Sequence, residues 1–170
     1  MWDEILDGAV EESRLWDECI LACDERKLVA VFSPLAEERF AVGLETIYEG
    51  YLVHYGKPRL FGPPDPDVAL LLGDYLYAHG LVRIASFGET DAVSDLSELI
   101  SLCSQLRAED LDGDGALWAA SAALLGSGRL DEARTALRLR GDAAPLEAAA
   151  RAAAGDAAVD EALAAHAALR

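Results

Sequence analysis

Apolar residues recur every three or four positions along most of the chain, the spacing that places them on one face of an α-helix. The first such stretch runs from Trp2 to Cys23 and has an acidic opposite face. A second follows Ser33, with Pro34 suited to the first helical turn, and ends near His54. The pattern therefore predicts two amphipathic helices in the first third of the chain.

The most apolar stretch follows a proline-rich loop. Asp65 is a natural N-cap and Pro66 fits the first turn, so we expect a helix from Pro66 to about Ala85. This segment is apolar on nearly all sides, which is typical of a helix buried in a core or in a subunit contact.

The helical pattern continues beyond this point but weakens. Helices are expected after Thr90 and from about Ala116 to Leu125. Residues 143–170 contain fifteen alanines, which favour helix but offer little side chain for packing. The run from Leu28 to Phe32 is short and isolated, so we interpret it as a linker or helix end. The sequence predicts an all-α protein, with a helical bundle over residues 1–141 and alanine-rich helices over 142–170 that dock on it or fray.

Charge narrows the range of partners. The chain carries 31 acidic and 14 basic residues, a formal net charge of −17 at pH 7. This charge repels the phosphates of DNA and RNA and anionic lipid surfaces. No basic stripe counters the repulsion, so we expect no nucleic-acid partner.

The lack of a recognisable targeting signal and the small number of cysteines lead us to expect a cytoplasmic protein. The first residues are acidic and lack the basic region of a signal peptide. The longest apolar run, Val68 to Val82, is shorter than the roughly 20 residues of a membrane span, so none is expected. Three cysteines are an odd, sparse set that fits a reducing compartment.

A series of short motifs follows one another between Glu45 and Arg107. In order, they are Glu45-Thr46-Ile47-Tyr48-Glu49, His54-Tyr55, Gly56-Lys57-Pro58 and Leu71-Leu72-Gly73-Asp74-Tyr75-Leu76. This order resembles that of the trans-polyprenyl diphosphate synthases, which have an Asp-Asp-x-x-Asp motif, two arginines, Gly-Lys-Pro, a loop and then a Leu-x-Gly-Asp-Tyr-Leu helix. The resemblance covers about half the chain and implies a truncated isoprenoid-synthase fold.

The departures from the family pattern imply a protein without catalytic residues. Glu45 and Glu49 stand at the metal side, but the middle ligand is missing. His54 replaces an arginine of the diphosphate side, where only Lys57 remains. The second aspartate-rich motif is absent, and Asp114 stands where the family has a lysine. We expect no cofactor, with Mg²⁺ needed only if the chain is a divergent isoprenyl diphosphate enzyme after all.

The resemblance also implies a partner. In the family, the helices matching Pro66–Ala85 and Thr90–Ala108 form the dimer contact. We expect an accessory or regulatory subunit that pairs with a catalytic polyprenyl synthase or forms a homodimer. A third hypothesis is a free-standing protein that binds an isoprenoid chain. The candidate interface residues are Leu70, Leu72, Tyr75, Tyr77 and Leu81.

Two further acidic features have alternative interpretations. Asp110, Asp112 and Asp114 match the first half of a calcium loop, but Ser121 stands where the loop needs a bidentate acid, so a capped turn is the alternative. Asp74 lies in the most apolar helix and needs a partner if it is buried. The candidates for that partner are His79, Arg83 and Lys57.

Overall fold

The computed structural model describes residues 1–170 as an all-α protein without strands, which confirms the predicted fold class. Two 3₁₀ turns, Ser33–Leu35 and Glu38–Phe40, precede the central helix. The α-helices are α1 (Trp2–Glu12), α2 (Arg14–Asp17), α3 (Ala41–Tyr55), α4 (Pro66–Ala85), α5 (Thr90–Ala108), α6 (Asp114–Ala123), α7 (Asp131–Arg140), α8 (Ala144–Ala154) and α9 (Asp156–Leu169).

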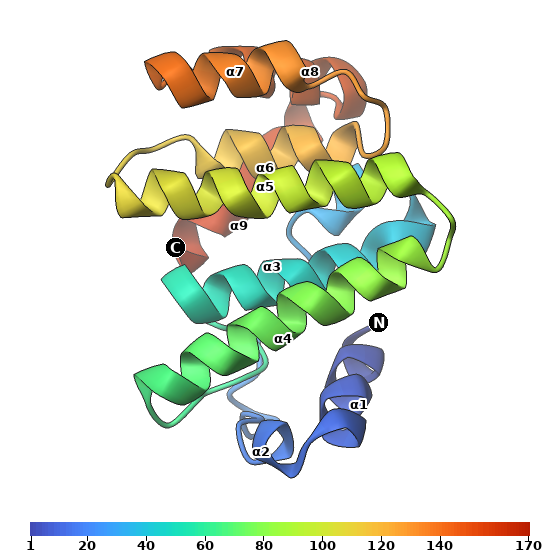
Figure 1. Cartoon of the computed structure of the whole chain (residues 1–170), viewed down its shortest axis with the longest axis vertical. Coiled ribbons are helices and arrows are strands. Elements are labelled where there is room, and N and C mark those ends of the chain that lie inside the picture. The colour runs from blue at the N-terminus through green and yellow to red at the C-terminus, as the bar shows by residue number, and fades with distance from the viewer.

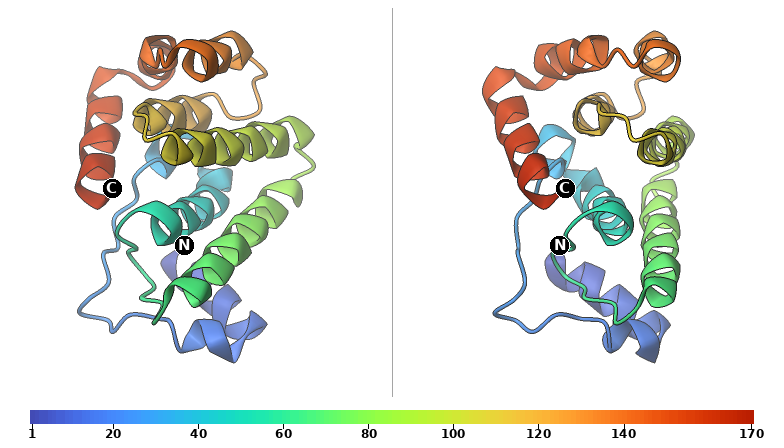
Figure 2. Two further views of the ribbon diagram at one scale, coloured as in Figure 1. Left: turned by 60° about the vertical axis from the view of Figure 1, so that its left-hand side comes forward. Right: turned by 90° about the vertical axis from the view of Figure 1, so that its left-hand side faces the viewer.

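α3 is the centre of the molecule. It is buried on every side from Gly43 to Leu52, although its sequence includes two glutamates. Figure 2 shows α4 and α9 on opposite sides of α3, while α5 and α6 lie above it in Figure 1. α7 and α8 cover the far end of the bundle, and α1 and α2 form a small layer at the other end. Any polar group on α3 must therefore find its partner inside the protein.

The crossing of α3 and α4 depends on glycine. A Cβ atom at Gly80 would lie 2.4 Å from Cγ1 of Ile47 and 2.8 Å from the carbonyl oxygen of Gly43. A Cβ atom at Gly50 would lie 3.0 Å from the carbonyl oxygen of Gly73. Glycines on both helices thus let the two backbones approach each other directly.

The predicted boundaries of α4 are correct at both ends. The Asp65 side chain accepts a hydrogen bond from the backbone N–H of Val68 at 2.9 Å, as expected for an N-cap. α5 begins at Thr90 itself, one residue before the expected start, and α6 begins at Asp114, two residues before the expected start.

The first two predicted helices are wrong in part. The expected helix from Trp2 to Cys23 breaks at Ser13, which is extended (φ −157°, ψ 136°) and caps a single following turn with its hydroxyl. The chain beyond Asp17 is irregular. The expected helix at Pro34 is only a 3₁₀ turn, because Ala36 and Glu37 are extended and the α-helix begins at Ala41.

The alanine-rich end packs into the same hydrophobic core as the rest of the bundle. Leu146, Val159 and Leu169 are buried in that core. The backbone N–H of Lys57 donates to the carbonyl oxygen of Leu169 at 2.7 Å, which holds the end of α9 against the end of α3. Residues 142–170 are therefore docked in this structure. The run from Leu28 to Phe32 is an irregular segment that leads into the first 3₁₀ turn.

Candidate functional site

Glu45 and Glu49 share one face of α3, as their spacing predicts, and both side chains are fully buried. Between them lies Arg59, which is also fully buried. Its Nη1 donates to Glu45 Oε2 at 2.6 Å and its Nε donates to Glu49 Oε2 at 2.9 Å. Burial by itself would lower the pKa of Arg59, but the two carboxylates outweigh burial and raise it. We call these three residues the Arg59 cluster.

The remaining carboxylate oxygens of the Arg59 cluster bind the backbone. Glu45 Oε1 accepts from the N–H groups of Val31 and Ser33 at 2.9 and 3.0 Å. Glu49 Oε1 accepts from the N–H of Leu60 at 2.7 Å and from that of the preceding residue at 2.8 Å. Every oxygen of the two side chains thus has a protein donor, and the cluster fastens two irregular segments to α3.

A second buried network surrounds Asp114 at the start of α6. Its Oδ2 accepts from the hydroxyl of Tyr51, and it lies 3.0 Å from Arg107 Nη2 and 3.5 Å from His166 Nε2. Nδ1 of His166 lies 2.9 Å from the hydroxyl of Tyr48. Burial would raise the pKa of Asp114, but the nearby imidazole of His166, the hydrogen bond from Tyr51 and the charge of Arg107 lower it below its ordinary value. The network joins α3, α5, α6 and α9.

The predicted calcium half-loop is divided between surface and interior. Asp110 and Asp112 are exposed, whereas Asp114 is buried in the network just described. Across the chain, no group of three or more His, Cys, Asp or Glu side chains lies close enough together to hold a metal ion.

The two residues predicted at the diphosphate side, His54 and Lys57, differ in solvent exposure. Lys57 is exposed at the end of α3, whereas the side chain of His54 is only 10% exposed. Nε2 of His54 lies 3.3 Å from Oδ1 of Asp74. Asp74 is 67% exposed, so it does not need a buried partner, and the residue beside it is His54 and none of the three candidates His79, Arg83 and Lys57. Arg83 instead donates to the carbonyl oxygen of Glu4 on α1 at 2.9 Å.

The five predicted interface residues point in different directions from α4. Leu70 is exposed, Tyr75 and Leu81 are half-buried, and Leu72 and Tyr77 are buried in the protein's own core, where a partner does not reach them. The hydroxyl of Tyr75 donates to the carbonyl oxygen of Gly8 at 2.8 Å, so it also serves an internal contact.

A different set of α4 residues faces outward. Figures 1 and 2 show α4 on the outside of the molecule, with no element beyond it. Leu70 and Leu71 are each 56% exposed and Val82 is 68% exposed, fractions that are large for apolar side chains on one helix. We call the exposed residues Leu70, Leu71, Asp74, Ala78 and Val82 the α4 face.

α4 is also the one helix that is long and apolar enough, by length and composition, to cross a membrane. Its most apolar window has a mean hydropathy of 1.3, and 33% of that window is buried inside the protein. Core helices of soluble proteins have the same composition, and the expected absence of a membrane span stays a prediction.

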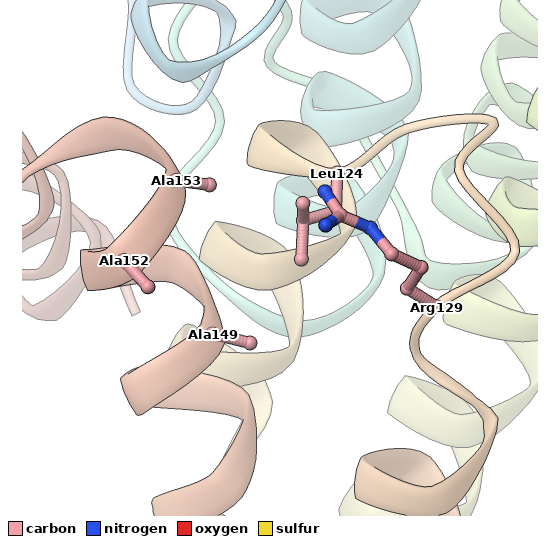
Figure 3. Close-up of a pocket in the computed structure, with 5 residues that line it drawn as sticks. All are labelled: Leu124, Arg129, Ala149, Ala152 and Ala153. Carbon is pink, nitrogen blue, oxygen red and sulfur yellow. The ribbon is translucent and has the colours of Figure 1, made fainter.

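A cavity of about 310 Å³ lies between the end of α6 and α8, lined by Leu124, Arg129, Ala149, Ala152 and Ala153 (Figure 3). The alanine methyl groups face Leu124, and Arg129 reaches over it from the loop before α7. None of the residues predicted as site residues lines this cavity.

Comparison with known proteins identifies no relative: no family model, no curated protein and no solved structure matches the chain.

Proposed function

We propose that this chain is a non-catalytic relative of polyprenyl diphosphate synthases that acts in the cytoplasm as an accessory subunit. In this proposal it binds a catalytic isoprenyl diphosphate synthase through the α4 face. The observation that carries the proposal is the exposure of three large apolar side chains, Leu70, Leu71 and Val82, on one outward helix. Several exposed apolar side chains on one helix favour an interaction site, since monomeric proteins keep contiguous apolar patches small, and the choice of a synthase as partner rests on the motifs between Glu45 and Arg107.

The Arg59 cluster supports the non-catalytic part of the proposal. Metal-assisted ionisation of a diphosphate needs carboxylate oxygens that are free to bind Mg²⁺. Glu45 and Glu49 give all their oxygens to Arg59 and to backbone N–H groups. A guanidinium from the chain itself thus occupies the place between the two acids where a cation would be bound.

Light scattering coupled to size-exclusion chromatography tests the proposal. The chain is run alone and with the catalytic polyprenyl synthase of the same host. We expect a stable mixed complex and a change in the chain length of the synthase product. Val82→Glu should abolish the complex without lowering the melting temperature, because Val82 is 68% exposed. Leu139→Glu on α7, at an apolar residue that is 73% exposed, is the matched control and should leave the complex intact.

Two results contradict the proposal. If the chain forms no complex with the synthase in this experiment, it is not the accessory subunit of that enzyme. Calorimetric binding of an allylic diphosphate that requires Mg²⁺ and is lost in Glu45→Gln supports a divergent enzyme instead.

A further inference from the structure

Asp74 lies at the centre of the α4 face. Leu70 and Leu71 are one helical turn before it, Ala78 is one turn after it and Val82 is two turns after it. All five residues are exposed, so an apolar partner that covers the leucines and Val82 must also cover the carboxylate of Asp74.

The protein does not neutralise this carboxylate. No basic residue belongs to the α4 face, and the one ionisable group paired with Asp74 is His54, at 3.3 Å. Burial lowers the pKa of His54 more than Asp74 raises it, so the imidazole is neutral at pH 7. Arg83, the one arginine of α4, is turned toward α1, where it lies 3.5 Å from Glu4. Asp74 thus has no cationic partner among the apolar residues of the α4 face.

This charge discriminates between partners. Covering a carboxylate with apolar surface removes its water without replacing it, which is unfavourable unless a cation is supplied. A second copy of the chain brings the same face to a two-fold contact, so its own Asp74 approaches instead of a cation. Net charge adds to the repulsion, since each copy carries −17. Like charges across an interface act as a device against the wrong partner.

We propose that Asp74 selects the occupant of the α4 face: an apolar helical surface that places a lysine or arginine opposite Asp74, and not a second copy of this chain. The inference rests on the proposed function, because it takes the α4 face as the binding surface, and it specifies the chemistry of the partner.

Charge exchange between copies of this chain tests the inference without a known partner. Light scattering at pH 7.5 should give the wild type as a monomer. Asp74→Leu, which removes the charge, should self-associate. An equimolar mixture of wild type and Asp74→Lys should contain a species of twice the mass, and Leu71→Glu in the Asp74→Lys copy should abolish it. Glu109→Lys, at an exposed acid outside the face, is the control and should not pair with the wild type.

Three results overturn the inference. One is a wild type that dimerises and is dispersed by Leu71→Glu. The second is a set of variants and mixtures that all remain monomeric. The third is flotation of the wild type with neutral phosphatidylcholine vesicles that Leu71→Glu abolishes, because the face then binds lipid. The mixed complex with the synthase is measured separately: if it forms and Asp74→Lys leaves it unchanged, the proposed function stands and only the selection by Asp74 fails.

Discussion

Arg59 holds two carboxylates that have no contact with water. The three charged groups leave one net negative charge in the interior, and four backbone N–H groups share in stabilising it. Such a cluster adds little to stability when complete, but losing one member leaves the others unpaired. Arg59 also has its guanidinium carbon 4.9 Å from the ring centroid of Tyr48, which extends the cluster into the aromatic core.

Replacing Arg59 tests this account directly. Arg59→Met should lower the free energy of unfolding by about 3–5 kcal/mol, because two buried carboxylates lose their cation. Urea denaturation followed by circular dichroism measures the change. The triple variant that adds Glu45→Gln and Glu49→Gln should recover part of the loss, since its amides carry no charge. A single variant as stable as the wild type contradicts the account.

Asp114 makes stability depend on pH. Its pKa is lower in the folded chain than its ordinary value of 3.8, so its ionisation stabilises the folded state above that value. This stability is lost as the pH falls below 3.8 toward the folded pKa. Asp114→Asn should cost about 2 kcal/mol at pH 7, and the difference from wild type should shrink in acid. Urea denaturation across pH 2.5–7 measures this, with the exposed Asp112→Asn as a control that changes little at any pH.

At the scale of elements, the contact between α3 and α4 fixes where the α4 face points. Close approach through the glycines of both helices leaves room for only one orientation of α4, with Leu72 and Tyr77 inward and Leu71 and Val82 outward. Because α4 has apolar residues on all sides, its sequence pattern does not determine which side faces the core. Packing against α3 determines it.

Gly80→Ala should therefore destabilise the protein although alanine favours helix. The added Cβ lies 2.4 Å from Ile47 Cγ1, which forces the helices apart at an expected cost of about 1–3 kcal/mol. Ala78→Gly on the exposed side is the matched control and should cost about 1 kcal/mol from helix propensity alone. Thermal melting measures both. A stabilised Gly80→Ala variant would show that α4 is not held closely against α3.

At the scale of the whole molecule, one hydrophobic core unites the bundle with its alanine-rich end. Val159, Ala162 and Leu169 of α9 are buried in it. His166 brings α9 to Asp114, and Arg170 lies 2.9 Å from Asp112. The two segments distinguished in the sequence by composition thus share their packing.

Removal of α9 should disrupt the whole fold. A chain ending at Gly155 loses the apolar residues that α9 adds to the core and the hydrogen-bond partner of Tyr48, so we expect loss of the near-ultraviolet circular dichroism of the aromatic core. Differential scanning calorimetry of the full chain should show one transition. Two separate transitions, or a shortened chain that melts like the full one, would indicate independent domains.

The features that could be predicted are those set by neighbouring residues, such as helix caps and the helical spacing of apolar positions. Asp65 and Pro66 fix the start of α4 from neighbouring positions alone, and the helical period identifies the all-α class. The break at Ser13 was missed because apolar residues on both sides keep a helical spacing. Arg59 was missed because its partners are brought together by folding. Two glutamates on an apolar helix were the available signal, since buried acids require a cation.

The contact between Asp114 and His166 could not be predicted from local sequence either. They are 52 positions apart, as their numbers give, and nothing local to either residue indicates the other. The sequence also could not predict which residues of α4 face outward, because the helix is apolar on all sides. Only Leu70 of the predicted interface residues is exposed, and Leu71 and Val82 were not among them.

The position of α9 has a consequence for synthesis on the ribosome. Arg59 can join Glu45 and Glu49 early, but Tyr48 and Tyr51 of α3 meet His166 only after α9 is made, about 100 residues after the end of α3. At the typical rate of about 5–20 residues per second, this interval lasts on the order of ten seconds. During it, the aromatic side of α3 lacks its α9 partner and is open to aggregation, so the nascent chain should depend on chaperones until α9 has left the ribosome.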